Sequence, residues 1–294
     1  SEQVVASFMS WLKPIDRRAR PRWLWPFMLA WMLVRSGLAA VAYRLTGAPR
    51  SWFVNETERN LLSAYMRSDL VVSCAGNFLY SSGRLGVPFM VAVFSIAYAH
   101  WVNKPLYTLP QSIGPLRYGW ERTLLQHVYS RARLVTVREP VSLKVALALR
   151  LPPERCVCLP DIAFGLTPDS PEAAKQHLLS QGVAIGRRPL LGVTLINWAA
   201  QNRTFTRQTQ YEAAVAHALR GFIDRYNGQV VFFAQVTGPT SAEDDRVVAR
   251  RMSTQLADRP GAVVVIDKIC TAQELKALYG HMDLFLGTRM HSNI

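Results

Sequence analysis

Cysteine is scarce in this sequence, which has four cysteines among 294 residues. They are too few and too scattered for the disulfide framework of a small secreted domain, and none forms a C-x-x-C pair, so we expect a reducing compartment. Cys156 and Cys158 would lie on one face of a strand and could bind a metal ion there, but buried packing of small thiols is far more common. We therefore expect no metal site. The cysteines are Cys74, Cys156, Cys158 and Cys270.

Acidic residues are also few, since 20 Asp and Glu stand against 34 Lys and Arg and leave a net charge of +14. Such a field concentrates anions. Nucleic acid, phosphorylated metabolites and an anionic membrane surface all fit it, and a generally arginine-rich surface is the alternative that needs no ligand. Nucleic-acid binders typically interleave a basic stripe with aromatic residues, whereas these arginines are dispersed, so we expect no nucleic-acid partner.

A long uninterrupted apolar run is missing. Residues 23–43 come nearest, but Arg35 lies in their middle and Pro26 near their start, so the run falls short of the ~20 residues that span a membrane. No cleaved signal peptide is evident, and we expect a cytoplasmic protein. The segment is either a basic amphipathic element on an anionic membrane surface or a buried helix with a solvated lead-in. The basic residues before it are Lys13, Arg17, Arg18, Arg20 and Arg22.

The balance of apolar and charged residues, 50% against 18%, excludes a disordered chain. A typical domain of about 150 residues predicts two domains in this length. From Asp69 onward, short β-rich runs alternate with longer helical segments, which is typical of a doubly wound α/β fold. Residues 166–171 contain two prolines and are the candidate linker, which places the domains at 1–168 and 169–294.

The predicted elements follow one another without a tandem repeat. The predicted strands are residues 70–73, 106–109, 133–137, 157–159, 190–196, 229–236, 263–266 and 283–287. The predicted helices are residues 87–102, 118–130, 140–149, 208–226, 241–256 and 271–279, the last opened by a capping box of Thr271 and Glu274. The sequence stops within residues 287–294, where a helix should begin, so we expect a cut chain.

Five segments at strand ends are distinctive, and α/β folds place their ligands outside the carboxyl ends of strands. In chain order they are Asp69-Leu-Val-Val-Ser-Cys-Ala-Gly-Asn-Phe-Leu79, Gln111-Ser-Ile-Gly-Pro115, Val137-Arg-Glu-Pro-Val-Ser142, Pro160-Asp-Ile-Ala-Phe164 and Gly287-Thr-Arg-Met-His-Ser292. Each is weak alone, but together and in this order they resemble the signature of polysaccharide pyruvyl transferases. The resemblance covers roughly three quarters of the chain and leaves about the first 60 residues poorly matched.

The sequence departs from the family pattern in three places. Ala75-Gly76-Asn77 stands where the family usually has a run of glycines, and a Gly- and Asp-containing loop near the N-terminus is not found. The family's C-terminal helices, which return to the first domain and carry a basic residue implicated in donor binding, also have no counterpart in this sequence.

The resemblance implies a fold of the GT-B type, with two Rossmann-like, doubly wound domains facing a cleft and the C-terminal helices missing. The first domain would bind the acceptor and the second the donor. The implied reaction moves pyruvate from phosphoenolpyruvate onto two hydroxyls of a sugar as a cyclic ketal. The acceptor would be an exopolysaccharide, a cell-wall polysaccharide or a lipid-linked precursor. Phosphoenolpyruvate would be a co-substrate, with no cofactor, and a lipid-linked acceptor would favour peripheral contact with the inner face of the membrane.

The chemistry of this reaction selects candidate residues. Phosphoenolpyruvate carries a carboxylate and a phosphate, for which the planar guanidinium is suited, and Arg138 and Arg289 each lie at a strand-to-helix junction. We expect both to face one pocket. His291 is the candidate proton donor, since imidazole titrates near working pH, and Asp161 and Glu139 are candidates for activating a hydroxyl or orienting a catalytic side chain. The remaining candidate substrate-binding residues are Gly76, Asn77, Gln111, Ser112 and Ser292.

Each assignment has a structural alternative. Arg138 could form a salt bridge with Glu139 or Asp161, and Gln111 and Ser112 could serve turn chemistry alone. Asp244 and Asp245 read as first-turn acids of a helix. For the whole protein, the alternatives are a nucleotide-sugar glycosyltransferase of the GT-B type and a noncatalytic anion- or nucleic-acid-binding protein on the same fold.

Overall fold

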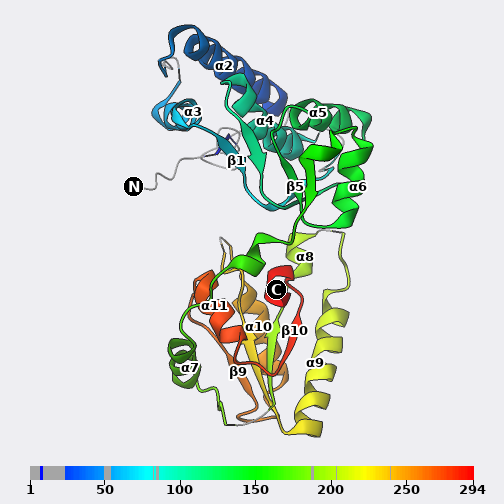
Figure 1. The fold of residues 1–294 in the computed structure, drawn as a ribbon. Coiled ribbons are helices and arrows are strands. Elements are labelled where there is room, and N and C mark those ends of the chain that lie inside the picture. Colours follow the sequence, from blue (N-terminus) through cyan, green and yellow to red (C-terminus); the bar gives the residue numbers. More distant parts are fainter. Residues whose placement is uncertain are drawn as a thin grey trace. The chain divides into compact units, whose positions relative to one another are not determined.

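The chain divides into two compact units, Ser1–Ile162 and Ala163–Ile294, each built of helices and parallel strands (Figure 1). The structure is a computed structural model that describes residues 7–8, 24–49, 54–81, 83, 86–186, 189–202, 204–238 and 240–294. The division falls after residue 162, so the candidate linker at 166–171 lies within the second unit. The α/β class with parallel sheets agrees with the expectation from the sequence.

The first unit contains a two-stranded sheet, β1-β3, and a four-stranded sheet in the order β2-β4-β5-β6. Their strands are β1 Val71–Ser73, β2 Gly76–Leu79, β3 Leu106–Thr108, β4 Gln111–Ile113, β5 Val135–Val137 and β6 Cys156–Cys158. The strands predicted from the sequence include neither 76–79 nor 111–113, where β2 and β4 lie, so the predicted order of elements needs correction. Pro110 separates β3 from β4, since proline has no N–H to donate to a strand ladder.

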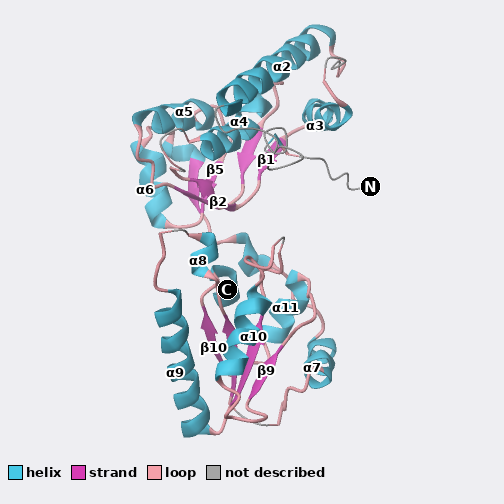
Figure 2. Ribbon diagram, turned by 180° about the vertical axis from the view of Figure 1, so that it is seen from behind, coloured by secondary structure: helices cyan, strands magenta, loops and turns pink. Residues whose placement is uncertain are grey.

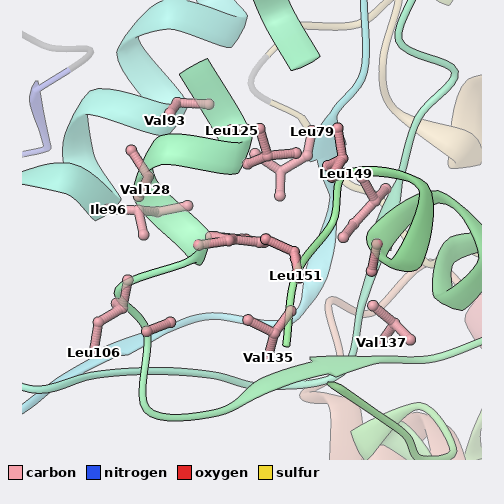
Figure 3. Close-up of a cluster of buried hydrophobic side chains, with 14 of the residues drawn as sticks. Leu79, Val93, Ile96, Leu106, Leu125, Val128, Val135, Val137, Leu149 and Leu151 are labelled. Atoms are coloured by element: carbon pink, nitrogen blue, oxygen red, sulfur yellow. The ribbon is translucent and has the colours of Figure 1, made fainter. Parts of the chain in front are cut away.

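Three helices bury the apolar side of this sheet. Figure 3 shows their core, in which Ile96 of α4 and Leu125 and Val128 of α5 lie near strand residues such as Val135. These side chains are at most 5% exposed, so the core excludes solvent. The three helices are α4 Val87–Trp101, α5 Gly119–Tyr129 and α6 Pro140–Ala148.

A second core of the first unit lies between α4 and two helices that precede the sheet, α2 (Trp25–Thr46) and α3 (Glu56–Arg67). Helix α2 is continuous through Arg35, whose Nη1 donates to Glu58 Oε2 of α3 at 2.6 Å. Pro26 lies in its first turn, where proline is tolerated. Within the described residues, Pro26–Thr46 is long and apolar enough to cross a membrane by length and composition. The helix is thus longer than the uninterrupted apolar run counted from the sequence, which Arg35 divides.

The second unit has a parallel sheet in the order β10-β7-β8-β9, covered on both faces (Figure 2). Its strands are β7 Leu190–Thr194, β8 Gln229–Phe233, β9 Val263–Val265 and β10 Leu284–Gly287. One face packs on α9 (Gln208–Tyr226) and α10 (Asp245–Gln255), and the other on α7 (Pro171–Ser180) and α11 (Ala272–Tyr279). This is the doubly wound arrangement that the alternation of elements predicts.

The strand order of this sheet reverses between β7 and β10. From β7 the chain moves outward to β8 and β9, and then returns to the other side of β7 to form β10. Two short elements follow these two strands, α8 (Trp198–Gln201) after β7 and the 3-10 helix η4 (Met290–Asn293) after β10. In open α/β sheets, ligands bind outside the carboxyl ends of strands at such a reversal.

Candidate functional site

Arg138 lies at the carboxyl end of the four-stranded sheet of the first unit, directly after β5. Its Nε donates to Ser112 Oγ at 2.7 Å and its Nη1 to Asp161 Oδ2 at 2.7 Å. Ser112 is on the neighbouring strand β4, and Asp161 follows β6 on the other side, so three adjacent strands meet here. Both side chains of the ion pair are 9% exposed. A buried, charge-matched pair of this kind holds the guanidinium in one orientation.

Glu139 extends this cluster at the N-terminus of α6, where it is the N-cap residue. It accepts hydrogen bonds from Ser112 Oγ at 3.1 Å and from Ser142 Oγ, and its Oε2 lies 3.5 Å from Arg138 Nε. The structure thus brings four of the predicted residues together, namely Arg138, Glu139, Asp161 and Ser112. The salt bridges named as the alternative for Arg138 are both present, so this arginine is at least a structural residue.

Gly76, Asn77 and Gln111 lie on the first two strands of the same sheet. Gly76 of the edge strand β2 pairs with Gln111 of β4, and Asn77 beside it is exposed. The Gln111 side chain is fully buried and donates from Nε2 to Tyr129 Oη at 2.8 Å. Its amide therefore faces the core, while its role in substrate binding stays a prediction, as do the roles of Gly76 and Asn77.

Two pockets among the described residues lie away from these side chains. A pocket of about 250 Å³ beside β1 is lined mostly by apolar groups, including Val71, Phe78 and Ile96. A pocket of about 370 Å³ lies between α7 and α11 and is lined by His177, Lys268 and other residues. None of the candidate catalytic or substrate-binding residues named from the sequence lines either pocket, so we assign no ligand to the two pockets.

In the second unit, Arg289 follows β10 at the reversal of strand order. Its Nε and Nη2 donate to Asp245 Oδ2 and Oδ1 at 3.1 and 2.6 Å. Asp245 is the first residue of α10, and its Oδ2 also accepts from the backbone N–H groups of Gln235 and Val236 at 3.2 and 3.0 Å. The Asp245 side chain is 1% exposed and that of Arg289 15%. The bidentate geometry fixes the plane of the guanidinium.

Gln201, the last residue of α8, contacts the other edge of this guanidinium. With its amide oxygen toward Arg289, it accepts from Nη2 at 2.9 Å and from Nη1 at 3.3 Å. An amide is a neutral acceptor, and an anionic oxygen in its place would form stronger, charge-assisted hydrogen bonds. Arg289 is therefore held by Asp245 along one edge and can exchange a neutral partner for an anion along the other.

The loop after β10 is tied to the end of β7. Ser292 is buried, and its Oγ lies 2.7 Å from Thr194 Oγ1 and donates to the carbonyl of Arg289 at 2.6 Å. Thr288 Oγ1 donates to the Thr194 carbonyl at 2.8 Å and accepts from Tyr211 Oη at 3.3 Å. Burial raises the pKa of Tyr211, so its hydroxyl stays a neutral donor. The role of Ser292 in substrate binding stays a prediction.

His291 lies in η4, two residues after Arg289, and is exposed. The helix expected to begin at this place is a single 3-10 turn in the structure. The predicted donor-side residues Arg289, His291 and Ser292 are thus on one loop of the second unit. The expectation that Arg138 and Arg289 face one pocket concerns the arrangement of the two units and stays a prediction.

The signature segments and their positions at strand ends agree with one protein family. A family model described as polysaccharide pyruvyl transferase matches residues 7–294. The chain belongs to this family. The resemblance drawn from the five segments is thereby confirmed.

Two known proteins are similar to this polysaccharide pyruvyl transferase family member. The amylovoran biosynthesis protein AmsJ of Erwinia amylovora is 28% identical over 194 residues, which are 65% of this chain and 46% of AmsJ. The chain therefore matches about half the length of that curated relative. The structure of a UDP-GlcNAc 2-epimerase from Methanocaldococcus jannaschii aligns with a TM-score of 0.48 and 10% identity, over 86% of this chain and 68% of that chain.

Two contacts of Arg289 in this pyruvyl transferase family member were not predicted from the sequence. Asp245 read as an ordinary first-turn acid, and it is one, but its carboxylate also holds Arg289. Gln201 lies in a four-residue helix that no periodicity reveals. Nothing local marks either residue, because their partner lies 44 or more positions away in the chain.

A metal site was not expected in this pyruvyl transferase family member. Among the residues that the structure describes, no group of three or more His, Cys, Asp and Glu side chains could hold a metal ion.

Proposed function

We propose that this protein transfers pyruvate from phosphoenolpyruvate to two hydroxyls of a saccharide and forms a cyclic ketal. The methylene carbon of phosphoenolpyruvate is protonated, and the two hydroxyl oxygens bond in turn to the enol carbon while its bond to phosphate breaks. The two hydroxyls lose two protons. One offsets the proton that the methylene carbon gains as it becomes a methyl group, and the released phosphate carries the other. The proposal rests on one observation in a member of this family: the Arg289 guanidinium donates two hydrogen bonds to the carboxylate of Asp245, which fixes its orientation.

The donor needs fixed cationic groups, because both its carboxylate and its phosphate are anionic. Arg289 meets that need at a position where the strand-order reversal also favours a ligand. Its orientation is set before any ligand arrives, so binding costs little reorganisation. We assign the donor to the second domain for this reason, with Arg138 as a second cation supplied by the first domain.

The proton transfers need an acid and a base within reach of the donor. His291 is the proposed acid, since it is exposed beside Arg289 and imidazole can both donate and accept a proton. Glu139 is the proposed base for a sugar hydroxyl, because 35% of its side chain is exposed, whereas Asp161 is 9% exposed and better suited to holding Arg138.

The acceptor in this proposal is an exopolysaccharide or its lipid-linked precursor. AmsJ is named for the biosynthesis of amylovoran, which supports an acceptor of this class. We place the acceptor on the first domain, near Gly76 and Asn77, and the two domains in a GT-B-like arrangement around a cleft. Phosphoenolpyruvate is a co-substrate in this scheme, no cofactor takes part, and the reaction takes place in the cytoplasm.

The decisive experiment is titration of phosphoenolpyruvate into the protein, followed by calorimetry, because it needs no known acceptor. We expect saturable binding by the wild type and its loss in Arg289→Ala. Arg225→Ala is the matched control, since Arg225 lies in the same unit near the end of α9. Absence of wild-type binding, or equal binding by Arg289→Ala, would contradict the proposal. Nucleotide binding in place of phosphoenolpyruvate would favour the glycosyltransferase alternative.

A further inference from the structure

Helix α2 has an apolar face that is open to solvent. Six large apolar side chains recur three or four positions apart, a spacing that places them on one side of a helix. Their exposed fractions run from 51% to 81%, so each of them leaves at least half of its surface open to solvent. The six residues are Phe27, Trp31, Val34, Leu38, Val41 and Leu45.

The opposite face of α2 is fixed to the first unit. Met32, Ala39 and Ala40 are at most 3% exposed and belong to the second core of that unit. Tyr43 Oη donates to the carbonyl of Met66 at 2.8 Å, which ties the end of α2 to α3. Because one face is packed in this way, α2 cannot cross a bilayer without giving up that core.

The one charge in the middle of α2 borders the apolar face, because the Arg35 guanidinium lies 5.6 Å from the centroid of the Trp31 ring. Arg35 is paired with Glu58, and its side chain is 18% exposed. Every exposed residue between Pro26 and Tyr43 is apolar. The surface side of an ordinary soluble helix carries polar residues, and a continuous apolar patch of this kind marks an interaction site.

The charge around α2 selects the partner. The first 50 residues contain eight of the 34 basic residues but only two of the 20 acidic ones. Arg44 is exposed in the last turn, near the end of the apolar face. An anionic lipid surface attracts such a basic segment electrostatically. A second copy of the chain would bring the same net charge of +14 and be repelled.

We propose that the apolar face of α2 inserts into the surface of an anionic membrane, with the helix lying in the plane of the interface. The aromatic rings of Phe27 and Trp31 and the aliphatic side chains beside them would enter the boundary between headgroups and acyl chains. Arg44, in the last turn of the helix, would contact the lipid phosphates. The inference concerns α2 alone and holds whether or not the proposed reaction is correct.

The test is co-sedimentation of the full chain with vesicles of phosphatidylglycerol and phosphatidylcholine, and with vesicles of phosphatidylcholine alone. We expect binding to the anionic vesicles, weaker binding at high salt, and little binding to the neutral vesicles. The double variant Val34→Gln with Leu38→Gln should lose at least about tenfold in partitioning, because two apolar side chains no longer enter the lipid. Leu179→Gln with Ile269→Gln is the matched control, since both residues are exposed apolar residues of the second unit.

Circular dichroism shows whether each variant is folded. If the double variant Val34→Gln with Leu38→Gln is unfolded, the double variant Phe27→Gln with Val41→Gln tests the same face. Equal partitioning of the wild type and a folded α2 variant would overturn the inference. So would an absence of wild-type binding to anionic vesicles. A dimer in solution that the α2 variants dissociate, without vesicle binding, would assign the face to a second copy instead.

Discussion

Asp245 is held on two sides, by the guanidinium of Arg289 and by two backbone N–H groups, and is almost fully buried. Asp245→Asn keeps the size of the side chain but removes the charge, and it leaves Arg289 without its counter-ion. We expect a loss of about 2–3 kcal/mol in the free energy of unfolding, measured by denaturant titration.

The adjacent residue provides the control for this change. Asp244 is the N-cap of α10 and pairs with Arg246, but its side chain is 14% exposed. Asn caps a helix as well as Asp does, and partly exposed ion pairs contribute little, so Asp244→Asn should cost less than about 1 kcal/mol. Equal losses in the two variants would contradict the special role of Asp245.

His291 is predicted to act in proton transfer and not in holding the donor. His291→Gln should therefore leave the affinity for phosphoenolpyruvate unchanged and lower turnover by about 100- to 10,000-fold. Phosphate release in the presence of acceptor measures the turnover, and calorimetry measures the affinity. His281→Gln is the control, since His281 lies in the same unit with its Nε2 2.9 Å from the Pro171 carbonyl. Unchanged turnover in His291→Gln would make it a structural histidine.

At the residue scale, the sequence predicts which side chains lie at strand ends but not what they contact. Arg138, Glu139 and Asp161 were predicted because they belong to segments that follow β-rich runs and resemble the family signature, and the alternation of elements places such segments at one edge of a sheet. The ion pair between Asp245 and Arg289 was not predicted, because a tertiary contact between residues distant in sequence leaves no local pattern. Gln111 was predicted to lie in a loop because Pro110, Gly114 and Pro115 interrupt regular structure around it, but it lies in β4.

The ion pair between Glu212 and Arg251 joins two helices of the second unit, α9 and α10, on one face of the sheet. Burial raises the pKa of Glu212, but hydrogen bonds from Arg251 and Gln208 outweigh burial and leave it below the usual 4.5. Because the folded pKa lies below the unfolded one, the pair stabilises the fold above the unfolded pKa of 4.5. That stability is lost as the pH falls through the folded pKa.

Glu212→Gln should therefore cost about 1 kcal/mol at neutral pH, and the difference from wild type should shrink in acid and vanish below the folded pKa. Urea unfolding over a series of pH values measures this. Glu172→Gln, a change at an exposed carboxylate of α7, should alter stability by less than about 0.5 kcal/mol. A Glu212 difference that is independent of pH would show that packing, and not charge, makes the contribution.

Regular elements with clear end signals could be predicted from the sequence. The helix predicted at 208–226 is α9, and the capping box of Thr271 and Glu274 marks the start of α11. Helix α7 was not predicted, and the candidate linker at 166–171 ends at Pro171, which is in fact the first helical residue after the cap of Ser170. Strands β2 and β4 were missed because they begin with Gly76-Asn77 and Gln111-Ser112, which are turn-forming or polar residues, whereas the equally short β1, β3 and β5 lie in apolar runs.

At the scale of the whole molecule, alternation predicts a parallel sheet but not the order of its strands. The place of β10 beside β7 depends on Gly192, because a Cβ there would lie 2.5 Å from the ring of Phe285 on β10. That ring in turn contacts Tyr279, with centroids 4.8 Å apart, and has little room to move. The lack of a side chain at Gly192 thus lets β7 and β10, which are distant in sequence, pack as neighbours.

Each unit has its own buried clusters, so we expect the chain to unfold in two transitions in denaturant or on heating. Gly192→Val overpacks the second unit against Phe285 and should lower only one transition, by about 2 kcal/mol. Leu125→Ala removes a fully buried side chain of the first unit and should lower only the other, by about 2–5 kcal/mol. If both variants shift a single common transition, the units unfold as one cooperative body, and the independence of their cores is wrong.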